Sequence, residues 1–183
     1  MPSQRRLIRY TGDRASLINL SYPAAKINCY SRIGEKLLLK IQSSIEIKAT
    51  AARIWSLLVN PEHIQKWCPV ETVRYSGEQR TGLKTLFYFE ELAIGRLLKF
   101  NFVVTEWVIN ESVAFKLTSG DFVKGYEQRY LIEQTHKGHR FTCFEDVKMP
   151  YGILGRIGGL FRRRISEGRL DRMLAKMKKL AEG

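Results

Sequence analysis

Apolar and polar residues alternate over most of the chain between residues 41 and 149, which is the pattern of half-buried β-strands. In the first such stretch, Ile41, Ser43, Ile45 and Ile47 share one face and polar residues lie between them. Six further strands are predicted at residues 71–75, 83–90, 96–108, 112–118, 125–134 and 140–149. The turns between these six strands are too short for parallel crossovers, so the predicted sheet is antiparallel.

Three helices are predicted, two short and one long. Thr50 is a suitable N-cap for the first, which ends at Asn60, and Pro61 opens the second, which ends at Trp67. The long helix spans residues 150–183, with one apolar stripe in its first half and a rotated stripe in its second. Gly168 lies between the stripes, so either the helix bends there or its halves pack against different partners.

The order of these elements predicts the fold class. A curved sheet with apolar residues on its concave side needs a cover, and the C-terminal helix is the one candidate long enough. The prediction is an α+β helix-grip fold, in which an antiparallel sheet of about seven strands wraps around the long C-terminal helix, with two short helices after the first strand. The predicted domain spans residues 40–183, and residues 1–39 form a poorly ordered or loosely docked N-terminal extension.

Charge is concentrated at the two ends of the chain. The 183 residues carry a net charge of +13, of which residues 1–39 contribute +5 and residues 150–183 contribute +6. An anionic membrane surface is therefore a possible partner of the basic C-terminal helix, the alternative being a solvated helix face. The predicted basic outer surface of this helix consists of Arg162, Arg163, Arg164, Arg169, Arg172, Lys176, Lys178 and Lys179. Nucleic acid is disfavoured because no aromatic stacking residues are interleaved with these charges. Three unpaired cysteines and the absence of a long apolar run predict a cytoplasmic protein.

Aromatic residues dominate the strand faces that should point inward. They suit a flat or oily ligand in a cavity between sheet and helix, or they fill the core and leave no cavity. The candidate cavity residues are Trp67, Phe87, Phe89, Phe100, Phe102, Phe115, Tyr130, Phe141 and Glu145, with Ile157 and Phe161 from the long helix.

Glu145 and Gln128 share inward faces with these apolar residues. A carboxylate inside the cavity would have a raised pKa and could act as a general acid, but buried carboxylates are rare. The interpretation adopted is that a bulge or strand end turns Glu145 toward water. No grouping of His, Cys or Asp has the form of a metal site, so neither metal nor cofactor is predicted. Cys143 is interpreted as a core residue and not as a nucleophile.

Several stretches resemble one protein family in the same order along the chain. The segments are SIEIKATAARIWSLLVNPEHIQKW, TEWVINESVAFKLTSGDF, GHRFTCFEDVKMPYGILGRIGGLF and LAKMKKLAE. Together they resemble the START-like or SRPBCC superfamily, in its polyketide cyclase/dehydrase and lipid transport branch, over about residues 40–182. The resemblance implies the helix-grip fold and a deep cavity for a hydrophobic ligand. It does not imply a fixed reaction, because family members include lipid carriers, hormone receptors and aromatase/cyclases.

Two functions lead the hypotheses, ahead of a third in which the basic ends of the chain dock on a membrane or on nucleic acid. The first is a binding or transport protein for a hydrophobic small molecule or lipid held between the sheet and the C-terminal helix. The second is a cyclase or dehydrase that acts on an aromatic or polyketide substrate, with Glu145 or Tyr130 as proton donor. The first is preferred because the sequence shows no certain pair of polar groups inside the cavity.

Overall fold

The computed structural model describes residues 32–33, 36–93, 95–121, 123–148 and 153–183, with side chains described from residue 40 onward except at 93 and 153–167. Its strands are β1 (Arg32–Ile33), β2 (Lys36–Ile47), β3 (Thr72–Tyr75), β4 (Leu86–Ala93), β5 (Arg96–Val108), β6 (Ser112–Gly120), β7 (Gly125–Thr135) and β8 (Gly138–Lys148). Its helices are α1 (Ala51–Val59), α2 (Pro61–Trp67) and α3 (Ile153–Glu182). The predictions for residues 1–31 and for the helix start at Pro150 lie outside the described residues.

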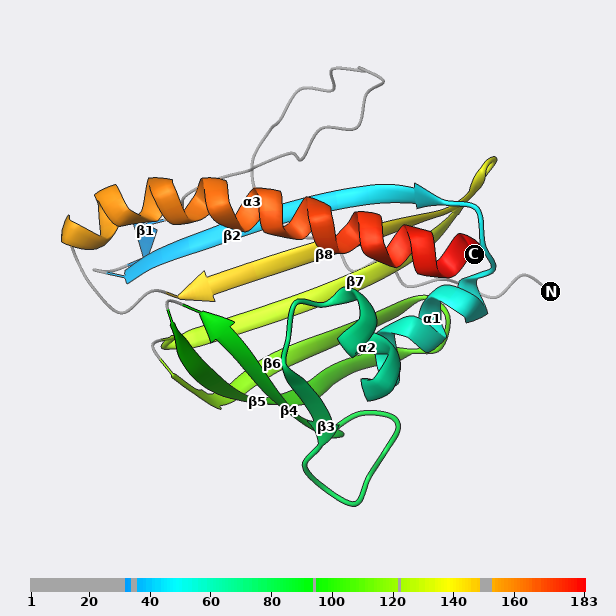
Figure 1. The fold of residues 1–183 in the computed structure, drawn as a ribbon, viewed down its shortest axis with the longest axis horizontal. Helices are drawn as coiled ribbons and strands as arrows, with labels where there is room; N and C mark the ends of the chain where they lie inside the picture. Colours follow the sequence, from blue (N-terminus) through cyan, green and yellow to red (C-terminus); the bar gives the residue numbers. More distant parts are fainter. Residues whose placement is uncertain (1–31, 34–35, 94, 122, 149–152) are drawn as a thin grey trace.

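The strands form one antiparallel sheet in the order β1-β2-β8-β7-β6-β5-β4-β3. The seven strands from β2 to β3 are those that the alternating pattern predicts, and the two-residue β1 is an addition at the edge of β2. Figure 1 shows the sheet curving beneath α3, with α1 and α2 beside the C-terminal half of that helix. The helix-grip prediction is confirmed.

The short helices begin and end where the sequence predicts. The Oγ1 of Thr50 accepts a hydrogen bond from the backbone N–H of Arg53 at 3.2 Å, which satisfies one free donor at the start of α1. Asn60 caps α2 in the same way, through its side-chain oxygen and the N–H of Glu62 at 3.0 Å. Their apolar faces join the core, where Ile54, Leu58 and Trp67 are buried.

The helix α3 is continuous through Gly168. Its second half packs along β2 and against α1 and α2, and Leu170, Met173, Leu174 and Met177 are buried there. This half therefore holds the helix on the sheet, as its apolar stripe predicts. The side chains of the first half lie outside the described part of the chain.

One strand begins later than predicted. The sequence predicts a strand from Leu83, but β4 begins at Leu86 and Leu83 is 55% exposed. The backbone is left-handed at Gly82 (φ 89°) and Lys84 (φ 67°), and the Oγ1 of Thr85 donates to the carbonyl of Gly82. The turn therefore continues to Thr85, because these local bonds hold it closed.

Candidate ligand-binding cavity

A cavity of about 200 Å³ lies between the concave face of the sheet, α2 and the second half of α3. Every strand from β4 to β8 contributes to its wall. The lining residues are Leu58, Ile64, Trp67, Cys68, Phe89, Glu91, Phe100, Phe102, Phe115, Val123, Tyr126, Gln128, Tyr130, Glu145, Val147, Arg169 and Met173.

Aromatic side chains are the largest class in this wall. Strand alternation turns Phe89, Phe102 and Tyr126 inward, where Phe102 lies edge-on to both others, with ring centroids 5.4 Å and 5.7 Å apart. Across the cavity, Trp67 meets Tyr130 edge-on at 5.9 Å. The indole N–H of Trp67 donates to the carbonyl of Leu57 at 2.9 Å, so this ring is fixed at the end of α2. The rings give the cavity a rigid and mainly apolar surface.

Five polar side chains come together at one part of the wall. Glu145 on β8 is only 2% exposed, and its Oε1 accepts a hydrogen bond from the Nε2 of Gln128 at 3.0 Å. The side chain of Tyr126 also lines the cavity close to this carboxyl. From α3, the Nη2 of Arg169 donates to the Oε2 of Glu91 at 3.0 Å. We call Glu91, Tyr126, Gln128, Glu145 and Arg169 the polar cluster.

Two interpretations made from the sequence are wrong at this cluster. Glu145 does not turn toward water, because β8 keeps its alternation and Gln128 donates a hydrogen bond to the buried carboxyl. Arg169 does not belong to the basic outer surface of the helix, because it lines the cavity and pairs with Glu91. The cavity therefore contains charged and hydrogen-bonding groups as well as rings.

Burial raises the pKa of several side chains in and around the cavity. It raises the pKa of Glu145, against the opposing effects of the Arg169 charge and of the polar side chains of Tyr126 and Gln128. Burial also raises the pKa of the Cys68 thiol to about 12, and it raises the pKa of Cys143 and of Tyr130. The two thiols therefore stay protonated at neutral pH and are poor nucleophiles.

Arg169 remains charged in this setting. Burial lowers its pKa, but the neighbouring Tyr126, Glu91 and Glu145 raise it by more.

A family model decides the classification. The model for "polyketide cyclase / dehydrase and lipid transport" matches residues 39–182, which is most of the chain. The chain belongs to this family. Among proteins with curated functions, none matches the chain.

Proteins from several organisms have solved structures with the same fold. A Thermus thermophilus protein has a TM-score of 0.67 and 17% identity, and covers 78% of this chain and 96% of its own. A START superfamily protein from Mycobacterium smegmatis has a TM-score of 0.65 and 17% identity, covering 78% and 97%. The Zhui aromatase/cyclase from a Streptomyces species has a TM-score of 0.66 and 12% identity, covering 79% and 94%. At these identities the likeness establishes the fold alone.

Most of the residues that the sequence predicts to line a cavity do line it in the structure. Trp67, Phe89, Phe100, Phe102, Phe115, Tyr130 and Glu145 all line it. Phe87 and Phe141 are fully buried but do not line it, because neighbouring rings cover them. The ring centroids of Phe87 and Tyr75 lie 4.9 Å apart. Phe141 stacks on Tyr130, with ring centroids 5.5 Å apart. The side chains of Ile157 and Phe161 lie outside the described residues.

Sequence reasoning missed Arg169, Glu91 and Tyr126 as cavity residues. Glu91 continues the inward alternation of Phe87 and Phe89 along β4, and Tyr126 shares its face with Gln128. Arg169 lies four residues before the buried Met173, which places both on one face of a helix. These spacings can be read from the sequence. They did not lead to a prediction of cavity residues because the three side chains are polar, and polar side chains are mostly exposed.

Proposed function

We propose that this family member binds a hydrophobic small molecule or lipid in the cavity beneath α3. The observation that carries the proposal is a cavity of about 200 Å³ whose wall is rich in aromatic side chains. Burial of about 300 Å² of apolar ligand surface would contribute roughly 7 kcal/mol, before the cost of association. Binding, rather than a particular reaction, is the function that such a wall supports directly.

Filling the cavity tests this proposal. Val147 lines the cavity from β8, next to the polar cluster, so Val147→Phe adds a ring within the binding space. We expect this substitution to weaken binding of the fluorescent probe N-phenyl-1-naphthylamine by roughly tenfold or more, because a phenyl group displaces ligand contacts. The matched control is Val108→Phe at an exposed position, which should leave probe binding unchanged. Equal affinities in both variants would contradict the proposal, provided that thermal unfolding shows both to be folded.

A second candidate is an enzyme of the cyclase or dehydrase type, and the buried Glu145 is the observation that favours it. A carboxyl with a raised pKa inside an apolar cavity suits general acid–base chemistry. As a base it would take a methyl proton from a ketone such as 2-acetonaphthone and return a deuteron in D₂O. Faster exchange with the parent than with Glu145→Gln, followed by NMR, would support catalysis. Identical exchange rates would exclude Glu145 as the base for this probe.

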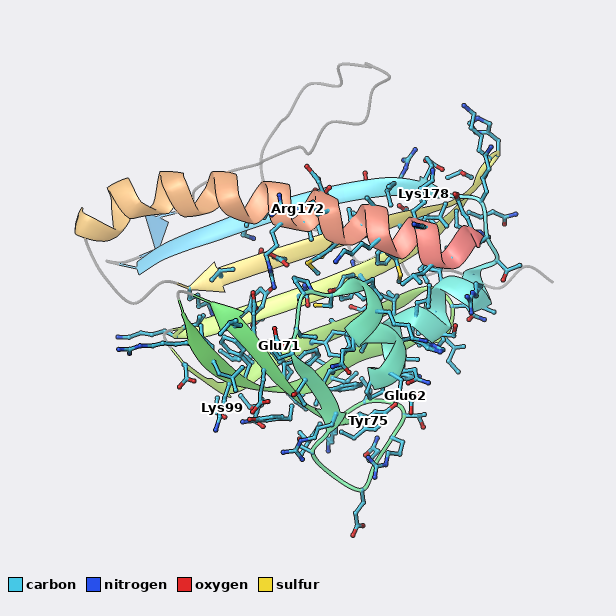
Figure 2. The ribbon with its side chains drawn as sticks, in the orientation of Figure 1. Glu62, Glu71, Tyr75, Lys99, Arg172 and Lys178 are labelled. Carbon is cyan, nitrogen blue, oxygen red and sulfur yellow. The ribbon has the colours of Figure 1, made fainter. Side chains whose placement is uncertain are left out.

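The exposed face of α3 supports a membrane as the site of ligand exchange. Arg172, Lys176 and Lys179 are exposed on the second half of this helix. Lys178 instead lies over β2, where its Nζ donates to the carbonyl of Glu46 at 2.8 Å (Figure 2). No helix in the described ranges is long and apolar enough to span a bilayer.

A further inference from the structure

Glu145 is a buried carboxyl without a counter-ion among the described residues. It is 2% exposed and lines the cavity, and its hydrogen-bond partner is the neutral amide of Gln128 at 3.0 Å. No cationic side chain in the described ranges forms an ion pair with it. The guanidinium in the cavity wall, that of Arg169, pairs instead with Glu91 at 3.0 Å. The wall therefore holds two carboxyl groups and one cation, and Glu145 is the carboxyl left over.

One oxygen of this carboxyl remains open to the cavity. Gln128 donates to the Oε1 of Glu145, and no described side chain donates to its Oε2 within hydrogen-bonding geometry. The atom that is both sealed from solvent and unpaired in this part of the chain is the Nε of Arg169, so the Oε2 of Glu145 is not sealed. A ligand beside this oxygen can therefore donate a hydrogen bond to it, through an N–H or an O–H group.

Two tyrosine rings flank the carboxyl. Glu145 lies opposite Gln128 in the pairing of β7 with β8. The next inward residues of β7 on either side are Tyr126 and Tyr130, and both line the cavity. Aromatic faces attract cations, most strongly where water is excluded, and rings around a cation are a general means of binding organic ammonium groups. The carboxylate between these two rings adds the opposite charge.

A cation would also offset the cost of burying this carboxylate. Burial raises the pKa of Glu145, which means that the apolar surroundings disfavour its charged form. An ammonium group of a ligand would stabilise the charged form, because the two opposite charges would meet in a medium of low dielectric constant. A neutral alcohol would satisfy the Oε2 but leave the charge uncompensated, and an anion would meet two carboxyl groups.

We propose that the ligand is a hydrophobic primary or secondary amine, whose protonated nitrogen donates to the Oε2 of Glu145 between the rings of Tyr126 and Tyr130. Its apolar part lies against the other aromatic residues of the wall. This inference rests on the proposed function, because it names the class of ligand for the same cavity. Glu145 is then the residue that distinguishes an amine from a neutral molecule of the same shape.

The test compares three probes that share a naphthalene ring and differ in one side group of nearly constant size. They are 2-(aminomethyl)naphthalene, which is protonated at neutral pH, 2-naphthalenemethanol and 2-ethylnaphthalene. Each is titrated into the full chain by displacement of N-phenyl-1-naphthylamine. We expect the parent to bind the ammonium probe most tightly. Glu145→Gln should weaken that probe at least about thirtyfold, because its charge loses the opposite charge in an apolar surrounding.

Two comparisons show whether this loss is specific. Glu145→Gln should leave binding of 2-ethylnaphthalene within about threefold of the parent, which also shows that the variant is folded. The matched control is Asp146→Asn, at the next residue of β8, where the carboxylate pairs with Lys40 away from the cavity. This variant should bind all three probes as the parent does.

Nuclear Overhauser effects locate the nitrogen. The methylene protons beside the nitrogen of bound 2-(aminomethyl)naphthalene should show them to the ring protons of Tyr126 and Tyr130, in a chain with labelled tyrosine. Their absence under saturating probe would overturn the proposed position. Equal loss of the ammonium and hydrocarbon probes in Glu145→Gln, or tighter binding of the alcohol than of the ammonium by the parent, would overturn the proposed class of ligand. Failure of the parent to bind 2-ethylnaphthalene and N-phenyl-1-naphthylamine would instead contradict the proposed function itself.

Discussion

Glu145 and Arg169 reach the same cavity from opposite sides, one from the sheet and one from the helix that covers it. Burial of either ionisable side chain without a polar partner would cost free energy. A hydrogen bond from Gln128 offsets the cost for Glu145, and the ion pair with Glu91 offsets it for Arg169. At the scale of single residues, the site is therefore a set of polar groups held in an apolar surrounding by their mutual contacts.

The raised pKa of Glu145 leads to a prediction about stability and pH. Below about pH 4.5 the carboxyl is protonated in both the folded and the unfolded chain, so its burial has no ionisation cost. Above that pH the unfolded chain releases the proton while the folded chain retains it, so stability falls as pH rises toward the folded pKa. We expect Glu145→Gln to gain stability relative to the parent as pH increases above about 4.5. Urea unfolding at a series of pH values measures this difference.

The matched control for this series is Glu62→Gln, which makes the same change at an exposed position on α2. A stability difference between Glu145→Gln and the parent that does not vary with pH would show that the carboxyl titrates alike in both states.

The sequence could predict which residues point inward, but not which of them border a void. Phe87 and Phe89 alternate identically along β4, yet only Phe89 lines the cavity, because Tyr75 and Phe115 pack against Phe87. That outcome depends on residues far away in sequence. The inward position of Arg169 depends likewise on Glu91, which lies 78 residues earlier.

Secondary-structure elements were more predictable than the site, because each depends on local pattern. The alternation of apolar and polar residues predicts β2 and β4–β8. The N-caps Thr50 and Asn60 predict where α1 and α2 begin. The start of β4 was missed because the left-handed backbone at Lys84 is uncommon for a residue with a side chain. The second stripe of α3 was predicted correctly, and it is the part of the helix that packs on β2 and the short helices.

This role of α3 predicts a large cost for substitutions in its second half. Met177 is fully buried, so Met177→Ala should lower the free energy of unfolding by about 2–5 kcal/mol through lost contacts and a residual cavity. Lys176→Ala changes the adjacent exposed residue and should alter stability by no more than about 0.5 kcal/mol. Chemical denaturation followed by circular dichroism compares the two. Similar stabilities would mean that the helix does not hold the sheet as the structure indicates.

For the whole molecule, the distribution of charge along the chain matters more than the net charge. Residues 40–149 carry only +2, so the excess lies at the two ends, including α3. A helix that covers a hydrophobic cavity and presents cations outward is well placed to meet an anionic lipid surface while ligand enters or leaves.

Reversing these charges tests the membrane hypothesis. A triple variant, Arg172→Glu, Lys176→Glu and Lys179→Glu, should reduce co-sedimentation with phosphatidylglycerol vesicles by at least about tenfold at low salt, since each exposed cation near an anionic surface contributes about 1 kcal/mol. The control reverses Lys66, Lys84 and Lys137, which are exposed elsewhere. Equal vesicle binding by the two variants would place any membrane contact away from the second half of α3.

The most direct test of the binding function is native mass spectrometry of the full chain, purified without detergent, followed by organic extraction and titration with N-phenyl-1-naphthylamine. The account predicts a hydrophobic molecule that co-purifies with the chain and is displaced by the probe. A chain that carries no such molecule and also fails to bind the probe would contradict it, because the aromatic cavity beneath α3 would then have no affinity for hydrophobic ligands.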